Sequence, residues 1–448
     1  MARIRHTIVE AVTAVKEHGV HLPSRRMVFD TCRMLGHRWR RGPLDPFNTI
    51  IVFLIQILHG NTACADACLL SGLGVTDSAY CQARRRLPLG LFTTLFTRLV
   101  DDLLRSTAHA SHWLGHRVFI IDGSSFSMPD TPDLQKHFGQ PSGQKKGCGF
   151  PMAHLMALCD LGTGLVIDLI ASPLQSGDLT KGVRTHRVLR TGDVVLGDRA
   201  FGTWGYFALV LQHHLHAVTR AHQRLKLSLN PRQRWHERGT YCRLYTLDDE
   251  DQVIEWFKPR HRPKWMSLTL YERLPPSIIV RVIRYTIRRK GFRTREVTLL
   301  TTLTDHARYP ADKLAALYSR RWEIETNFRD LKETMGMKTL RCRTVDGVLK
   351  EMYTCAIAYN LVRMMCLQAG TRQGVDARRI SFIHALRSLR QMLVLGCAGE
   401  PPPRLTVNPH RPGRVEPRLV KRRPPQRRYL TVPRTEARKR LQAPQLAA

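Results

Sequence analysis

Residues 317–332 read LYSRRWEIETNFRDLK, and this stretch decides how the rest of the chain is interpreted. It carries Tyr318, Arg321, Glu325 and Lys332 at spacings of three, four and seven residues. At roughly 100° per helical residue, these side chains are predicted to share one narrow stripe of a helix. Such a stripe is typical of a metal-assisted phosphate site, because the carboxylate can hold a divalent cation while the cations and the phenol hold phosphate oxygens.

Two more carboxylates follow short apolar runs that read as buried strands. Asp122 directly follows residues 118–121, whereas one residue, Gly197, separates Asp198 from residues 194–196. Ligand sites in open α/β sheets assemble at strand ends, so we expect both acids to lie near Glu325. Three acids repel one another unless cations lie between them. Two divalent ions roughly 3.5–4 Å apart would relieve the repulsion and would also serve phosphodiester chemistry. Hard oxygen ligands favour Mg²⁺, with Mn²⁺ as a substitute.

Each acid also has a purely structural explanation. An Asp after a strand is usually a turn former, and Glu325 could be an ordinary helical ion-pair partner of Arg321. Glu323 points roughly 200° away from Glu325 on a uniform helix, so the two cannot face one site. The rivals for the same roles are Asp160, Asp168, Asp193 and Glu323.

The charge of the chain favours a polyanionic partner. Its formal net charge is +35, from 71 Lys and Arg against 36 Asp and Glu. Nucleic acid is the first candidate, an anionic membrane surface is the second, and a merely basic solvated surface is the bland alternative. Hydrophobic residues make up 43% of the 448 residues, which permits a sizeable core in one elaborated domain or in two to three domains.

The cysteines and the apolar runs indicate a soluble protein of a reducing compartment. The chain has 11 Cys, and Cys64 and Cys68 have no second pair at a zinc-like spacing, so we interpret them as buried thiols. The N-terminus lacks the apolar run of a signal peptide, and residues 50–58 are too short to span a bilayer. We therefore expect a cytoplasmic protein with no membrane partner.

Composition and pattern divide the chain into five parts. Residues 84–86, a triple Arg, are predicted to form the exposed end of a short helix that docks on DNA, with a solvated helix end as the alternative. A Pro- and Arg-rich segment cannot bury a core, so the C-terminal tail is expected to be largely disordered. The predicted parts are a helical, DNA-binding region (1–110), the first part of an α/β core (111–221), a β-rich insertion with a basic face (222–295), the second part of the core with C-terminal helices (296–397) and the basic tail (398–448).

Over roughly residues 75–370, the chain resembles bacterial DDE transposases of insertion-sequence family four. The Tyr-x2-Arg-x3-Glu-x6-Lys signature of that family is matched without a departure in the stretch quoted above. Its first aspartate motif is matched by Ile-Asp-Gly-Ser at 121–124, and its second by Gly-Asp-Arg-Ala-Phe at 197–201. The family also inserts a β-rich region between the second Asp and the Glu. The resemblance implies a ribonuclease-H-like mixed-sheet core interrupted by that insertion.

The resemblance also implies roles for individual residues. Asp122, Asp198 and Glu325 would be the catalytic acids and would hold two Mg²⁺ ions. Tyr318, Arg321 and Lys332 would bind DNA phosphate near the cleaved end, with Arg320 adding to the grip. An aromatic side chain of the insertion, Trp256 or Trp265, would stack on an extruded base, unless both belong to the core.

The implied reaction is a nick at the element end followed by attack of the freed 3′-hydroxyl on the opposite strand or on target DNA. The expected partners are double-stranded element ends and target DNA, bound by a homodimer at the nucleoid. Two alternatives stay open: a catalytically silent DNA-binding protein derived from a transposase, and a Mg²⁺-dependent nuclease without strand transfer. The three intact acids disfavour the first alternative, whereas spacing alone does not separate a nuclease from a transposase.

Overall fold

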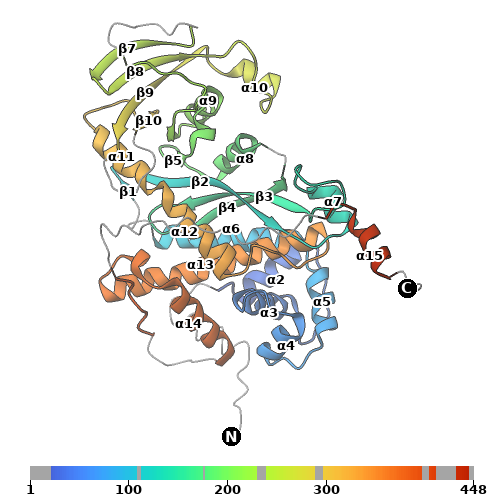
Figure 1. The fold of residues 1–448 in the computed structure, drawn as a ribbon. Helices are drawn as coiled ribbons and strands as arrows, with labels where there is room; N and C mark the ends of the chain where they lie inside the picture. Colours follow the sequence, from blue (N-terminus) through green and yellow to red (C-terminus); the bar gives the residue numbers. More distant parts are fainter. Residues whose placement is uncertain are drawn as a thin grey trace.

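The computed structural model describes residues 22–107, 112–174, 177–229, 239–287, 296–395, 403–409 and 430–442. In this part of the chain, ten strands form one mixed sheet, with helices on both faces (Figure 1). The strand order is β4-β3-β2-β5-β6-β10-β9-β8-β7, and the short β1 (His112–Trp113) pairs with β2. The protein is therefore a mixed α/β structure built around a large sheet.

Five strands form the half of the sheet that carries the candidate acids. β2 (His116–Ser127), β5 (Val194–Gly197) and β6 (His216–Arg220) run parallel to one another. β3 (Met152–Asp160) pairs antiparallel with β2 and with β4 (Val166–Pro173), with which it forms a hairpin. The continuous apolar runs of β2 and β5 are buried because helices cover both faces of the sheet.

The β-rich insertion extends the same sheet rather than forming a separate one. β10 (Glu296–Thr301) pairs with β6 on one side and with β9 (Ser277–Thr286) on the other. β8 (Asp251–Phe257) and β7 (Tyr241–Asp248) complete the antiparallel half. A short helix, α10 (Leu268–Arg273), precedes β9. The strands of both halves thus share one hydrogen-bonded ladder.

Helices from both ends of the chain pack together below the sheet (Figure 1). The central one, α13 (Val345–Gln373), contacts α3, α6 and α14. Every residue of α3 (Pro46–Leu58), which contains the apolar run 50–58, is buried. The other helices of this layer are α2 (Arg25–Met34), α4 (Cys64–Ser71), α5 (Asp77–Arg86), α6 (Leu89–Ser106) and α14 (Phe382–Leu395). None of the described helices is long and apolar enough to cross a membrane.

The prediction of an exposed triple Arg on α5 is wrong for its first member. Arg84 lies over the rings of Phe53 and Tyr80, at 4.6 and 5.4 Å, and donates a hydrogen bond to Gln56 Oε1 at 2.9 Å. Cation–π contacts explain why the side chain turns inward. The following two arginines are exposed, so only they are available to a partner.

The signature stretch is helical but not uniform. It comprises α11 (Ala311–Ser319), a 3-10 turn η3 (Arg320–Trp322), α12 (Glu323–Arg329) and a π-helical turn η4 (Asp330–Thr334). The uniform helix assumed from the spacing is therefore wrong. A 3-10 turn eclipses residues three apart, and the ion pair between Arg320 and Glu323 joins two such residues at 2.9 Å.

The tail is more ordered than expected. Leu405 is 2% exposed, and Val407 bridges to Ile380 in an antiparallel pair. Farther on, α15 (Arg434–Gln442) lies beside α7 (Pro132–Phe138) (Figure 1). The tail, expected to be largely disordered, is thus ordered in these two segments, and residues 398–402, 410–429 and 443–448 lie outside the described part.

Candidate active site

Asp122 and Asp198 lie just beyond the parallel pairing of two neighbouring strands, β2 and β5. β2 and β5 stop pairing before either acid is reached. Asp122 stands within β2, which continues to Ser127, rather than after the strand as the sequence indicated. Its Oδ1 accepts a hydrogen bond from the backbone of Gly123 at 2.8 Å. Asp198 begins the turn after β5, where its Oδ1 accepts from the backbone of Ala200 at 2.8 Å.

The signature helix packs its two predicted phosphate-binding cations against β2. Arg321 Nη1 donates to Asp122 Oδ2 at 3.2 Å, and Lys332 Nζ donates to Ser124 Oγ at 2.9 Å. Asp122 and Ser124 are two residues apart in a strand, so their side chains leave the same face. The structure therefore brings both cations of the stripe onto one face of β2, eleven residues of irregular helix apart.

The pKa of Asp122 ties the three acids to one electrostatic environment. Burial raises this pKa above its ordinary value. The hydrogen bond from Gly123 and the guanidinium of Arg321 lower it, whereas the carboxylates of Asp198 and Glu325 raise it. Both carboxylates therefore lie close enough to Asp122 to act on its charge, although the three acids are far apart in the sequence.

Two buried donors near these acids have no partner within the described part of the chain. They are the hydroxyl of Tyr318 and the Nε of Arg321. Burial raises the pKa of Tyr318 to about 12, while Arg321 and Arg220 lower it and Asp198 raises it. The phenol therefore stays protonated at neutral pH. Unpaired buried donors are costly, and an anionic oxygen would satisfy both groups.

The donor set fits a hard divalent cation, although a finished coordination site is not formed. Across the described segments, no group of three or more His, Cys, Asp or Glu side chains is arranged to hold a metal ion. Asp122, Asp198 and Glu325 offer carboxylate oxygens, the ligands preferred by Mg²⁺ and Mn²⁺. Their mutual repulsion is the condition that a bound cation relieves. Arg321 occupies one oxygen of Asp122 instead.

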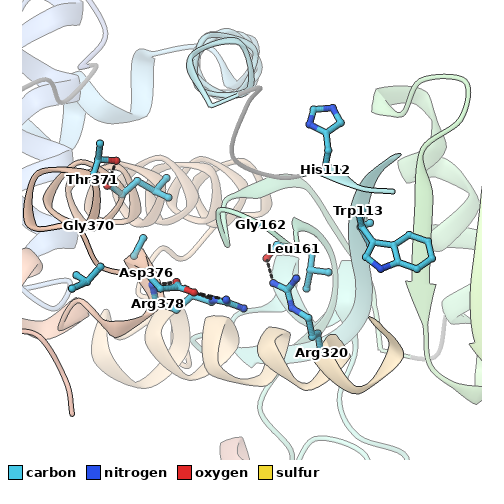
Figure 2. Close-up of a pocket in the computed structure, with 14 residues that line it drawn as sticks. His112, Trp113, Leu161, Gly162, Arg320, Gly370, Thr371, Asp376 and Arg378 are labelled. Carbon is cyan, nitrogen blue, oxygen red and sulfur yellow. Dashed lines mark hydrogen bonds and ion pairs between the residues drawn. The ribbon is translucent and has the colours of Figure 1, made fainter. Parts of the chain in front are cut away.

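A cavity of about 470 Å³ lies on another side of the signature helix, and none of the three acids lines it (Figure 2). Arg320 points from the helix toward the carbonyl of Leu161, which accepts its hydrogen bond at 3.3 Å (Figure 2). Glu323 Oε1 lies 2.9 Å from Arg320 Nε and 2.7 Å from Arg378 Nη1. Arg378 also pairs with Asp376. This network fixes the start of α12 to the helical layer.

The rival acids are held in structural contacts. Glu323 belongs to the network just described. Asp160 accepts hydrogen bonds inside the turn between β3 and β4. Asp168 pairs with Arg187 at 3.0 Å, and Asp193 pairs with Arg117. These acids therefore contribute to packing and turns.

The exposed aromatic residue of the site comes from the signature rather than from the insertion. Trp256 is 5% exposed, packs on Phe207 and thus belongs to the core. Trp265 is half-buried against Gly205. Trp322 is 56% exposed, and the guanidinium of Arg321 lies 5.2 Å from its ring. Sequence reasoning missed Trp322, although its position between Arg321 and the acid was a signal.

Sequence reasoning also missed a contact between a histidine and a carboxylate beside Asp122. His154 Nε2 lies 2.9 Å from Asp178 Oδ1, the first residue of α8 (Asp178–Arg184). The imidazole fills the space over Gly123, where an added Cβ would come within 2.8 Å of the ring. A side chain larger than hydrogen directly after Asp122 would therefore require the imidazole of His154 to shift. The Gly in the first aspartate motif was the only signal for this contact.

Comparison with known proteins decides the family. The sequence model of the family described as "Transposase DDE domain" matches residues 113–361, which is more than half of the chain. The chain belongs to the transposase DDE domain family. The matched segment of this DDE transposase includes Asp122, Asp198 and the whole signature stretch. Helices α2 to α6 and α14 and α15 lie outside it.

Individual relatives agree with that assignment. Transposase InsG for insertion sequence element IS4 of Escherichia coli (strain K12) is 27% identical over 379 residues, covering 80% of this chain and 79% of the relative. The transposase for insertion sequence element IS231B of Bacillus thuringiensis subsp. berliner is 23% identical over 337 residues, covering 65% and 66%. Both support the expected resemblance to insertion-sequence family four. The protein is accordingly a DNA transposase, of a family that uses divalent metal ions.

A solved structure was also found. It is the piggyBac transposase synaptic complex with hairpin DNA, with a TM-score of 0.43 and 12% sequence identity, covering 88% of this chain and 81% of that chain.

Proposed function

We propose that Asp122, Asp198 and Glu325 are the catalytic acids of this transposase and that they hold two Mg²⁺ ions, for which Mn²⁺ can substitute. The observation that carries the proposal is the contact of the signature helix with β2, where Arg321 Nη1 donates to Asp122 Oδ2 at 3.2 Å while the charges of Asp198 and Glu325 also act on Asp122. Bound divalent ions supply positive charge for the attacking and leaving oxygens of phosphodiester chemistry. No covalent link between enzyme and DNA is required, because hydroxyl groups are the nucleophiles.

The chain's own residues bind and orient the DNA end. Lys332, held on Ser124, and Arg321, held on Asp122, present cations beside the acids. A phosphate there would accept from the free hydroxyl of Tyr318, which remains protonated. Preorganised donors of this kind stabilise charge that develops in the transition state. The exposed ring of Trp322 offers a stacking surface to an unpaired base at the same place.

The sheet order supports a ribonuclease-H-like core. β2, β5 and β6 are parallel, and β3 and β4 follow antiparallel on the other edge of β2. Two of the acids follow the last parallel pair of β2 and β5, the end of the parallel ladder at which ligand sites assemble in open sheets. We therefore keep the proposed division into a split core (111–221 and 296–397) with a β-rich insertion, although its strands continue the core sheet.

A basic groove in the N-terminal helices supports DNA binding by residues 1–110. Its volume is about 850 Å³, and it runs between residues 37–44 and α5. None of the described residues that line it is acidic. Phosphate contacts of this kind give affinity without sequence readout. The groove is lined by the cations Arg38, Arg40, Arg41 and Arg86 and by Trp39.

The test of the proposed acids compares cleavage with binding. Asp122→Asn, Asp198→Asn and Glu325→Gln should each lower cleavage of an element end by ~10²–10³-fold or more, because charge stabilisation is lost. DNA binding should stay nearly intact, since the basic surface is unchanged. Glu333→Gln is the matched control, because Glu333 lies on the same helical run and pairs only with Lys338 at 3.1 Å among the described residues. Retained cleavage in a variant would remove that acid from the proposed set.

Strand transfer is tested separately. Purified protein, a DNA end and a target plasmid should give joined products, and nicked or linear plasmid alone would identify a nuclease. The proposed homodimer rests on the resemblance to the family. Two protomers per pair of ends in analytical ultracentrifugation would support it, and a single protomer would refute it.

A further inference from the structure

The helix α15 is attached to the core through Arg434. The guanidinium carbon of Arg434 lies 3.4 Å from the ring centre of Phe150, and its Nη1 lies 3.5 Å from Asp130 Oδ2. Its backbone N donates to the carbonyl of Gly147 at 3.1 Å, and Pro433 packs on the same glycine. The side chains of the ion pair are 17% and 19% exposed. These contacts give the tail a defined position.

The attached helix adds its charges to those of a neighbouring loop. Arg438 and Lys439 on α15 are exposed, as are Lys136 on α7 and the loop residues Lys145 and Lys146. None of these five has an ion-pair partner among the described residues. We refer to these five residues as the tail patch. Free, exposed cations gathered from two distant parts of the chain favour an anionic partner.

The tail patch lies downstream of the acids along β2. This strand runs from Asp122 past Ser124, where Lys332 is bound, to Ser127, whose backbone N donates to the carbonyl of Lys338 at 3.0 Å. At about 3.3 Å per residue, the path from Asp122 to Ser127 measures roughly 17 Å. Ser127 pairs with Met152 at the start of β3, and Phe150 comes two residues before Met152. At about 3.3 Å per residue, the point where α15 is attached therefore lies roughly 20–25 Å from Asp122. Along one DNA strand this corresponds to about six or seven phosphates at 3.4 Å each.

We propose that α15 is an ordered part of the DNA-binding surface. Held by Arg434 on Phe150, it forms with the α7 loop a phosphate-binding patch for duplex DNA, about six or seven nucleotides from the scissile phosphate. This inference rests on the proposed function of the Asp122 site. A merely diffuse attraction of a basic tail would depend on charge alone and would not require the helix to be attached.

The test is hydroxyl-radical footprinting on a duplex that carries the element end flanking this gene, with EDTA present to prevent cleavage. Arg438→Ala with Lys439→Ala removes two charges of the patch, whereas Phe150→Ala releases the helix and removes none. Both variants should lose protection about six or seven nucleotides from the cleavage position. The charge variant should also lower the slope of log affinity against log salt by about 2. Lys313→Ala with Arg372→Ala, which removes two exposed charges from other helices, should keep the protection.

The proposal would be overturned if Phe150→Ala gave the same footprint as the wild-type protein. It would also be overturned if the variants bound DNA more weakly but still protected every nucleotide that the wild-type protein protects. Arg434→Gln provides a second release variant, and thermal melting of every variant excludes global unfolding as the cause. Cleavage by the wild-type protein with Mg²⁺ is measured in parallel. Cleavage without the tail footprint overturns this inference alone, whereas a footprint without cleavage overturns the proposed function.

Discussion

Arg321→Ala tests whether the site is assembled before DNA arrives. Arg321 Nη1 lies 3.2 Å from Asp122 Oδ2, and the side chains are 11% and 23% exposed. At an effective dielectric constant of about 20, the Coulomb energy of such a pair is about 5 kcal/mol. Removing one partner of a buried pair costs about 3–5 kcal/mol, because the other charge is left uncompensated. Since Asp122 retains some solvent and can take a proton, we expect a coupling free energy of about 2–4 kcal/mol.

The assay is a double-mutant cycle on the free energy of unfolding, without metal, using Arg321→Ala, Asp122→Asn and both together. Asp122→Asn should recover most of the stability lost in Arg321→Ala. The control cycle uses Arg105 and Asp102, an exposed pair at 70% and 41%, for which at most ~1 kcal/mol is expected. A coupling below about 0.5 kcal/mol at the site would refute the reasoning, since the contact would then be screened by solvent.

The raised pKa of Asp122 also predicts how the free energy of unfolding depends on pH in the wild-type protein and in Arg321→Ala. The pKa of Asp122 is raised in the folded protein, so the folded state binds more protons than the unfolded chain above the ordinary carboxyl pKa of about 3.9. The stability contribution of Asp122 therefore falls as pH rises through this window. In Arg321→Ala, only the hydrogen bond from Gly123 still opposes burial and the other acids, so the pKa of Asp122 should rise further and the loss of stability should be larger and extend to higher pH. An unchanged pH profile would contradict the assigned causes.

Three further predictions concern neighbouring side chains. Lys332→Ala should reduce cleavage by ~10²-fold and weaken end binding, as measured by single-turnover kinetics and gel shift, because a charged phosphate donor is lost. Glu323→Gln should raise the Mg²⁺ concentration required for half-maximal cleavage without changing DNA affinity, since the contact with Arg378 that positions α12 is weakened; an unchanged metal requirement would reject the positioning role. Trp256→Ala should destabilise the protein by about 3–5 kcal/mol in denaturant titration, whereas Trp322→Ala should change stability by at most ~0.5 kcal/mol.

The strands and the acids of the core were predictable because short-range patterns determine them. The apolar run at 194–196 predicted β5, which the candidate acid Asp198 follows directly. The length of β2 was underestimated, because its continuation through Ser127 depends on pairing with β3. That the strands of the insertion extend the core sheet was not predicted, for the same reason. Pairing of β9 with β10 is a tertiary event that local propensity does not encode.

The inward turn of Arg84 and the attachment of α15 depend on contacts across the fold. Arg84 contacts Phe53 and Gln56, which lie about 30 residues before it in the sequence. Arg434 contacts Phe150 and Asp130, which lie roughly 280–300 residues before it. Composition assigns such residues to solvent, because Arg is usually exposed. The folded structure, not the local sequence, brings the ring of Phe150 and the carboxylate of Asp130 to the guanidinium of Arg434. The composition of a basic segment therefore predicts the charge of its binding partner better than it predicts whether the segment itself is ordered.

The orientation of Glu325 shows how an irregular turn can serve the site. A 3-10 turn advances about 120° per residue rather than 100°, so three residues rotate everything after them by roughly 60° relative to Tyr318. Tyr318 and Arg321 lie before or within the turn and are 5% and 9% exposed, whereas Glu325 follows it and is exposed. The turn thus separates the buried side chains that we propose as phosphate donors from an acid that solvent, and hence a metal ion, can reach. Because Glu323 is held by Arg378 from 55 residues downstream, that separation is determined by the C-terminal helical layer as much as by the signature itself.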